Sequence, residues 1–245
     1  MKETRMVMGM PATIEVVDDF VTQENLNEVF DYFTYVDEKF SVYKTTSEIS
    51  KYNRGEITLD DLSDNMKLIF KLSEETKNVT NGYFDINFKE TCDPSGLVKG
   101  WAIYNGAKIL RKYNLKNFCV EIAGDMEVSG LNQDGENWKI GIRNPFKVGE
   151  IIKVVQLQNK GIATSGTSIR GEHIINPLNH MPANAIVSLT VIGPNVYEAD
   201  RFATAAFAMG QTGIQFIEDL PGFDGYMVDH QGIATFTSNF NQYTI

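Results

Sequence analysis

The sequence predicts an α+β fold in which largely antiparallel sheets pack against helices. Two long stretches with apolar residues at helical spacing lie in the first half of the chain, and short strands joined by turn signals fill most of the second half. The sequence contains no internal repeat, low-complexity tract or flexible linker. We therefore expect residues 1–245 to form one domain, and this pattern also allows two lobes around a central cleft.

The composition is that of an ordinary globular protein, with 42% hydrophobic and 22% charged residues among 245. The formal net charge of −10 argues against duplex nucleic acid as a partner, because such binding depends on clustered Lys and Arg. A nucleotide remains compatible with this charge, since a metal and backbone amides can hold it. Two cysteines, Cys92 and Cys119, are too few for a disulfide framework or a four-ligand zinc site.

The chain shows no targeting or membrane signal. No apolar run approaches about 18 residues, and the first ten residues lack the basic-then-apolar pattern of a signal peptide. The two cysteines are most simply isolated thiols in a reducing compartment. We therefore expect a soluble, cytoplasmic protein without a membrane anchor.

The first element is a strand. Between Arg5 and Val17 alternate residues are apolar, which is the period of a half-buried strand. Gly9 and Pro11 interrupt the pattern in the segment MGMP, which includes Met8. A glycine within a strand marks either a bulge that a ligand approaches or a kink in an edge strand, and both interpretations remain open.

Two helices and a polar segment follow. Thr22 caps a helix whose apolar stripe extends to Phe40, and a second helix is expected over residues 61–79. In the intervening segment FSVYKTTSEISKYN, Ser47 opens a short turn or helix. Tyr43 can stack there on a planar ligand or pack on its own loop.

A turn and a short strand come next. Asn81-Gly82 is a turn signal, and residues 83–87 (YFDIN) are expected to be extended. On a strand, Asp85 would point away from its two neighbours Phe84 and Ile86.

The segment DPSGLVKGWA begins a helix. Ser95 can cap it, Gly96 permits close approach at the first turn, and Lys99 lies within that turn. Exposed amides, a glycine and a lysine together make an anion cradle, although a lysine at such a position is more commonly a solvated charge.

Short strands and two hairpins are expected in the second half. The hairpins join residues 126–130 to 138–143, and residues 225–229 to 233–237. The other elements expected here are strands at residues 118–122, 151–157, 161–163 and 185–192, and a short helix at residues 213–220.

Two further segments carry polar residues that allow chemistry. The hydroxyl-rich turn at residues 164–167 can bind an anion or serve only as a turn. His173, in the segment GEHIINP, is one of three histidines, and a lone histidine is more often structural or exposed than catalytic.

The helix expected at residues 199–210 (ADRFATAAFAMG) carries an acid and a hydroxyl one turn apart. Asp200 and Thr204 therefore lie on the same face, among small apolar neighbours that predict burial. An unpartnered carboxylate there would be costly. It is explained by a partner Arg or Lys, by a capping role, or by a metal with oxygen ligands.

Taken in order, seven motifs resemble those of the FAD:protein FMN transferases, the ApbE-like flavin transferases, over nearly the whole chain. They are MGMP at 8–11, FSVYKTTSEISKYN at 40–53, GYFDI at 82–86, DPSGLVKGWA at 93–102, ATSGT at 163–167, HIINP at 173–177 and ADRFATAAFAMG at 199–210. The resemblance implies that the protein uses Mg²⁺ to transfer FMN from FAD to a Thr or Ser hydroxyl of an acceptor flavoprotein, with release of AMP. It also implies an ApbE-like fold with a flavin cleft.

The resemblance also implies roles for particular residues. Asp200, Thr204 and the backbone carbonyl of Gly96 would ligate the metal, and His173 falls where the family has a proposed general base. Lys99 would be a second cation at the reacting phosphates. The residues that would line the FAD site are Met8, Tyr43, Tyr83, Phe84, Asp85, Asp93, Lys99 and Ile174.

The chain departs from the family pattern at three places. The usual DxGG approach to the lysine is Asp93-Pro94-Ser95-Gly96, the NxGGD segment is EIAGD at 121–125, and HxxDP has become HIINP. The lipoprotein-type leader of many relatives is absent, which suits a cytoplasmic acceptor. Two alternatives use the same residues: an FAD pyrophosphatase that releases FMN and AMP, and a non-catalytic protein that binds or delivers FAD.

Overall fold

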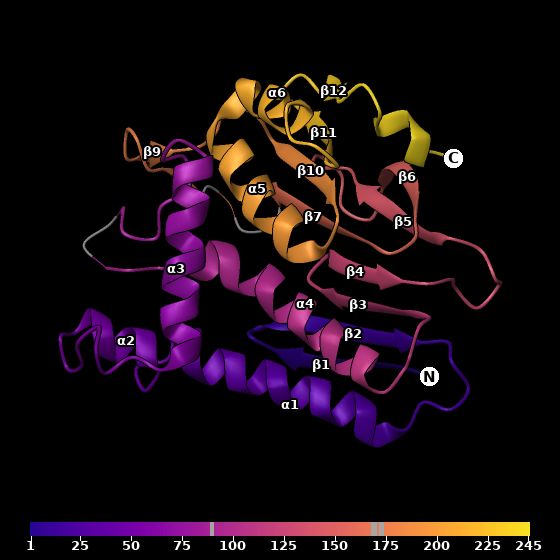
Figure 1. Ribbon diagram of the computed structural model, residues 1–245. Coiled ribbons are helices and arrows are strands. Elements are labelled where there is room, and N and C mark those ends of the chain that lie inside the picture. The colour runs from indigo at the N-terminus through magenta and orange to yellow at the C-terminus, as the bar shows by residue number, and fades with distance from the viewer. Residues whose placement is uncertain (89–90, 168–170, 172–173) are drawn as a thin grey trace.

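An eight-stranded antiparallel sheet runs through the molecule in the computed structural model, which describes residues 1–88, 91–167, 171 and 174–245 (Figure 1). The predicted class, helices packed on largely antiparallel sheet, is confirmed. In their order across the sheet the strands are β1 (Lys2–Val7), β2 (Met10–Val16), β3 (Phe118–Ile122), β4 (Asp125–Ser129), β7 (Lys160–Gly166), β10 (Ser188–Gly193), β11 (Asp224–Val228) and β12 (Ala234–Phe236).

Helices cover one face of this sheet, as Figure 1 shows. The apolar stripes of α1 and α4 bury the inward residues of β1 to β3, and α5 covers β7 and β10. The helices are α1 (Gln23–Phe40), α2 (Glu48–Asn53), α3 (Asp64–Val79), α4 (Ser95–Lys112), α5 (Val196–Ala208) and α6 (Gly213–Glu218), with short 3-10 turns η1 (Gly210–Thr212) and η2 (Phe240–Tyr243).

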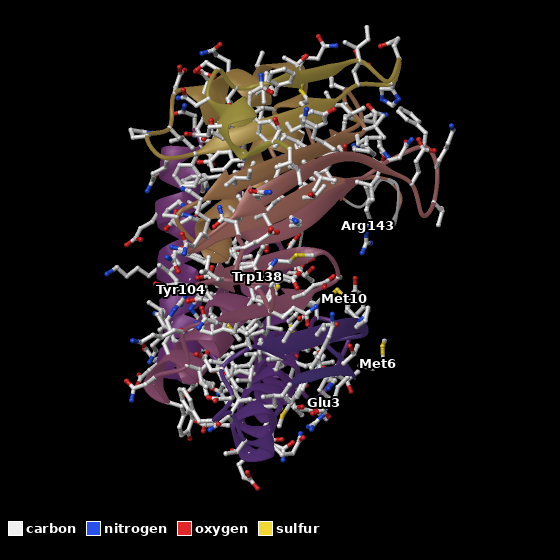
Figure 2. The ribbon with its side chains drawn as sticks, turned by 90° about the vertical axis from the view of Figure 1, so that its right-hand side faces the viewer. Glu3, Met6, Met10, Tyr104, Trp138 and Arg143 are labelled. Atoms are coloured by element: carbon white, nitrogen blue, oxygen red, sulfur yellow. The ribbon has the colours of Figure 1, made fainter. Side chains whose placement is uncertain are left out.

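A second, two-stranded sheet of β5 (Trp138–Arg143) and β6 (Ile151–Leu157) packs on the other face. The alternation along β7 explains both contacts, because Ile162 packs against the β5–β6 sheet and the next residue, Ala163, packs against α5. In Figure 2, Tyr104 of α4 lies on one side of the molecule and Arg143 of β5 on the other. A third small sheet pairs β8 (Ile175–Asn176) with β9 (Met181–Pro182).

Several local predictions are confirmed. Thr22 is the N-cap of α1, and its hydroxyl and the Asn25 side chain form a reciprocal capping box. Ser47 caps α2, and β11 and β12 form the expected hairpin. The second long helix begins later than expected, because Ser63 rather than a residue near 61 accepts the capping hydrogen bond.

The expected first strand is wrong in one respect, because it is a hairpin and not one strand. Met8 and Gly9 both have positive φ angles, 52° and 70°, and connect β1 to β2. Two residues of positive φ fit the twist of a two-residue hairpin turn. The glycine in MGMP therefore makes a turn, and neither a bulge nor a kink.

Three other expectations are corrected. Residues 83–87 form turns, yet Phe84 and Ile86 are buried and Asp85 is partly exposed, so the expected alternation survives without a strand. Residues 164–166 belong to β7 and are not a turn. β5 pairs with β6 and not with β4, because the intervening loop carries the chain to the other face of the main sheet.

The start of α4 also differs from the expectation. Pro94 is its N-cap, and the Ser95 side chain makes no capping hydrogen bond. The carboxylate of Asp93 takes this role instead by accepting the Ser95 N–H at 3.1 Å. Both cysteines are free thiols, and among the described helices none combines the length and apolarity needed to cross a membrane.

Candidate active site

A cleft of about 1280 Å³ lies where segments distant in sequence meet. The β1–β2 turn, the end of α1, the start of α4, α5, β5 and the end of β7 all contribute to it. Of the twelve residues predicted for the site, eleven line this cleft: Met8, Tyr43, Tyr83, Phe84, Asp85, Asp93, Gly96, Lys99, Ile174, Asp200 and Thr204. His173 is outside the described residues.

Helices α4 and α5 approach closely at the back of the cleft because Gly100 lies between them. A Cβ on Gly100 would lie 2.6 Å from the Cβ of Asp200, so a larger residue would push the helices apart. The Gly100 N–H donates a hydrogen bond of 2.8 Å to Asp200 Oδ2. The second turn of α4 thus directs a backbone amide at the carboxylate, and a hydrogen bond to the ionised form favours negative charge there.

Asp200 is buried, with 4% of its surface exposed. The pKa of this carboxyl is raised to about 7, chiefly by burial and also by the nearby Asp125 carboxylate, whereas Lys99 and the Gly100 amide oppose the shift. A group with this pKa near neutrality sits in a cleft with a specific charged partner. Such a perturbed group in a cleft marks a candidate functional site.

Lys99 is not a solvated helix charge. Its ammonium pairs with Asp125 Oδ2 and lies 3.7 Å from Asp200 Oδ1, with 19% of the side chain exposed. Two carboxylates therefore face one ammonium. The anion cradle predicted at this helix start has a lysine held in place by two acids.

Asp125 is a site residue that the sequence reasoning missed. It is 1% exposed, and its Oδ1 accepts the backbone N–H of Thr164 at 3.0 Å. The preceding residues Ala123 and Gly124 both have positive φ, so a tight turn places Asp125 at the first position of β4. The available signal was the segment EIAGD, whose closing Gly-Asp matches the end of the NxGGD family motif although its beginning does not.

The three residues predicted to hold a metal come together. Thr204 Oγ1 donates a hydrogen bond to the Gly96 carbonyl at 3.5 Å, and Asp200 lies one turn earlier on the same helix. A Cβ on Gly96 would lie 3.3 Å from Thr204 Cγ2 and 3.2 Å from Phe84, so glycine permits this approach. Ser165 Oγ, from the hydroxyl-rich segment of β7, lies 3.4 Å from Thr204 Oγ1.

This donor set fits a hard cation. It consists of oxygen atoms from a carboxylate, a hydroxyl and a carbonyl, the ligands that Mg²⁺ takes together with water and phosphate. Within the described part of the chain no group of three or more His, Cys, Asp or Glu side chains could hold a metal. A cation here would therefore depend on backbone, hydroxyl and substrate oxygens for most of its ligands.

The cleft also offers aromatic surface and two anchored acids. Tyr43 is 92% exposed at the rim, and Phe84 is largely buried. Asp85 forms a 2.7 Å ion pair with Lys77, and Asp93 caps α4 as described above. Flat rings beside fixed polar groups suit a ligand with planar, hydrogen-bonding ring systems.

Comparisons with known proteins show which family and fold the chain shares. The model of the ApbE family matches residues 8–93 and 89–227. A FAD:protein FMN transferase of Vibrio cholerae is 33% identical over 129 residues, which cover 49% of this chain and 39% of that protein. One from Haemophilus influenzae is 32% identical over 130 residues, covering 49% and 38%. These matches thus cover about two fifths of the length of each curated relative.

Solved structures share the fold over the full chain. The ApbE protein of Thermotoga maritima superposes with a TM-score of 0.89 and 19% identity, covering 100% of this chain and 99% of that one. The flavin transferase ApbE of Vibrio cholerae gives a TM-score of 0.87 and 22% identity, covering 99% and 98%.

Proposed function

The chain belongs to the ApbE family, and on this basis we propose that it is a Mg²⁺-dependent FAD:protein FMN transferase. It would move FMN from FAD to a Thr or Ser hydroxyl of a target flavoprotein and release AMP. The observation that supports this most is the cleft itself, where eleven residues predicted from separate motifs meet. The transferase names of the curated relatives support the same activity.

We assign the metal to Asp200, Thr204 and the Gly96 carbonyl. When bound, Mg²⁺ would neutralise charge on the pyrophosphate of FAD, as metal ions do in phosphoryl transfer. Asp200 would enter this role ionised, because a cation nearby lowers the pKa of a carboxyl. Thr204 and Gly96 are already within 3.5 Å of each other, so little rearrangement would be needed to present both oxygens.

The transfer exchanges the phosphoanhydride bond of FAD for a phosphoester bond to the acceptor. The acceptor oxygen attacks the FMN-side phosphorus, the bond from that phosphorus to the bridging oxygen breaks, and AMP leaves with the bridging oxygen. Lys99, fixed between Asp125 and Asp200, would place its ammonium beside the phosphates and stabilise the departing charge. His173 would remove the proton of the acceptor hydroxyl during the attack.

The activity is tested by incubating the protein with Mg²⁺, FAD and candidate FMN-binding domains. Covalent flavin fluorescence on one domain after denaturing electrophoresis, together with an equal amount of AMP, is the expected result, and EDTA should abolish both. Free FMN and AMP without a labelled domain would indicate an FAD pyrophosphatase instead. FAD retained without AMP at long times would indicate a binding or delivery protein.

His173→Ala separates proton removal from flavin binding. We expect acceptor modification to slow by about a hundredfold or more, because a general base contributes on that order. The affinity for FAD, measured by the change in flavin fluorescence, should stay nearly constant. Equal loss of both would make His173 a binding residue and not a base.

Two further proposals concern the whole protein. We propose that residues 1–245 act as one domain, since a single sheet runs from β1 near the N-terminus to β12 near the C-terminus. We also propose a cytoplasmic location, which the two free thiols support.

A further inference from the structure

One edge of β5 borders the cleft. β6 pairs with the opposite edge of β5, and within the described ranges no strand pairs with the edge at the cleft. Residues 140–144 all line the cleft. Ile140 and Ile142 point into the core whereas Gly141 and Arg143 point to the exposed side, so residues of both faces reach the cleft along this edge.

The backbone groups of Gly141 point out from this open edge. On the far side of β6, the Ile245 N–H donates to the Val154 carbonyl at 3.4 Å, so that carbonyl points away from β5. Val154 is the register partner of Gly141. In an antiparallel pair, two residues directly opposite each other point their N–H and C=O groups either both toward the partner or both away from it. Because the carbonyl of Val154 points away from β5, the N–H and C=O of Gly141 point away from β6.

Arg143 has the same backbone orientation, because it lies two residues further along the strand. The irregularity in this ladder adds Ile152 to β6 and leaves β5 continuous. The side chain of Arg143 reaches the turn before Asp125, since a Cβ on Gly124 would lie 3.9 Å from its Cζ. Figure 2 shows Arg143 pointing from β5 toward the side where Met10 lies, and both residues line the cleft. The open edge therefore leads to the Asp125–Lys99–Asp200 cluster.

The charge of this segment differs from that of the chain. Residues 136–153 contain four Lys or Arg and two Glu, a net charge of +2, whereas the whole chain carries −10. An open strand edge accepts an extended peptide through main-chain hydrogen bonds, and exposed cations favour acidic side chains in that peptide. Arg143 is the one of these four cations that lines the cleft, so the edge is complementary to an extended segment with an acidic side chain opposite Arg143.

We propose that this edge binds the acceptor protein. The segment that carries the reactive Thr or Ser lies extended along β5, bonded to the outward backbone groups of Gly141 and Arg143, with an acidic side chain against the Arg143 guanidinium. The hydroxyl then enters the cleft beside Asp200 and Lys99. This inference rests on the proposed transferase function, because a hydrolase acting on FAD alone needs no polypeptide at the cleft.

Two substitutions at one position separate charge from strand pairing. Arg143→Gln removes the charge and keeps the N–H that points to the open edge. Arg143→Pro removes both, and an edge strand tolerates proline where the N–H faces outward. Lys71→Gln, on the exposed surface of α3 outside the cleft, is the control for loss of one positive charge.

The measurement is the rate of FMN transfer as a function of the concentration of the flavoprotein domain that the unmodified chain labels, and separately of FAD. We expect Arg143→Gln to raise the acceptor KM about fivefold relative to the FAD KM, and Arg143→Pro to raise it about 20-fold or more. Lys71→Gln should change neither.

Each other outcome overturns a defined claim. Equal acceptor KM values for the Gln and Pro variants would contradict the claim that the acceptor pairs with β5 as a strand. An equal rise of the FAD KM would instead assign Arg143 to the FAD site. If the chain formed a dimer that Arg143→Pro disrupted while the rate of FMN transfer stayed normal, the open edge would be the contact with a second copy of the chain. Absence of transfer by the unmodified chain to any domain would overturn the proposed function itself, which distinguishes the two failures.

Discussion

Strand β4 presents two buried carboxylates to the same pair of helices, and they differ in how their charge is balanced. Glu127 meets Arg111 of α4 at 2.7 Å and accepts the Val196 N–H at the start of α5 at 2.8 Å. Among the described residues, Arg111 forms an ion pair with no carboxylate other than Glu127. Asp125, two residues earlier, shares the Lys99 ammonium with Asp200.

We infer from this difference that one polar cluster stabilises the fold and that the other serves the proposed function. The Glu127 cluster is balanced and lies outside the cleft, so it fastens the ends of α4 and α5 to the sheet. Among the residues that the structure describes, the Asp125–Lys99–Asp200 cluster opens into the cleft and pairs two carboxylates with one ammonium. Buried charge without a full complement is costly, and a site that keeps it has a use for another cation.

Substitution of Asp200 is expected to have the largest effect on activity. Asp200→Ala removes the one carboxylate proposed to hold Mg²⁺, so turnover should fall by about a thousandfold or more. AMP release at saturating FAD and Mg²⁺ measures it, and the far-ultraviolet circular dichroism should remain that of the unmodified protein. Unchanged Mg²⁺-dependent turnover would remove the metal assignment.

Asp200→Asn tests how much the buried charge of Asp200 destabilises the fold, because asparagine removes the charge and leaves no cavity. The folded-state pKa of about 7 lies above the ordinary value of 3.8, so ionisation of Asp200 destabilises the fold increasingly as the pH rises from about 4 to 7. The amide lacks this cost. We expect its melting temperature without Mg²⁺ to exceed that of the unmodified protein at pH 8 and to converge with it near pH 4. A lower melting temperature at pH 8 would contradict the imbalance.

Lys99→Gln should have the second largest effect, about a hundredfold on turnover, because it removes a cation proposed to stabilise the departing AMP. It also leaves Asp125 and Asp200 without their shared ammonium. The melting temperature should therefore fall at pH 8 and recover below pH 7, where Asp200 is protonated. Added Mg²⁺ should restore part of it.

The control for this variant is Arg111→Gln, which removes the cation of the balanced cluster. It should lower the melting temperature while turnover per folded molecule stays constant. If Lys99→Gln and Arg111→Gln behaved alike in both measurements, the two clusters would not differ in function.

Asp125→Asn is expected to lower turnover about tenfold. The amide oxygen can still accept the Thr164 N–H, but the side chain no longer attracts the Lys99 ammonium, which then becomes less fixed. The decrease should appear in kcat more than in the KM for FAD, since the lysine is proposed to act on the departing group. A change confined to the KM would make Asp125 part of the FAD site.

The position of Asp125 also shows what the sequence could predict. Each helical or strand period, cap and turn involves residues that are close together in the sequence. Local patterns therefore predicted most elements and the fold class. Asp200 and Thr204 could be paired because they lie one turn apart on a helix. The sequence could not show that Asp125 lies beside Lys99. Only the pairing of β4 with β3 and β7 and the crossing of α4 with α5 bring these two residues together.

Other parts of the site were inaccessible for related reasons. The pairing of β5 depends on which face of the main sheet the chain crosses to, and nothing local in residues 126–143 encodes that choice. The turn at Met8 was hidden because every second residue from Met6 to Val16 is apolar despite Gly9 and Pro11 between them, and a two-residue turn keeps this period of two.

The smallest expected effect on activity comes from Glu127→Gln, where the two buried carboxylates are compared directly. Its amide cannot serve both Arg111 and the Val196 N–H as the carboxylate does, so we expect the free energy of unfolding to fall by about 1–3 kcal/mol. Turnover per folded molecule should not change, because Glu127 does not line the cleft.

The stability difference between Glu127→Gln and the unmodified protein should also change with pH, and the pKa of Glu127 gives the direction of that change. Burial raises the pKa of Glu127 above 4.5 even though Arg111 and the Val196 N–H lower it, so ionisation costs the unmodified protein stability as the pH rises from that value. The glutamine variant does not ionise and has no such cost. The difference in free energy of unfolding between the two proteins, measured with urea, should therefore become smaller from pH 4 to pH 8. A loss of turnover equal to that of Asp125→Asn would show that both carboxylates of β4 serve the reaction, and charge balance would no longer distinguish the site from the scaffold.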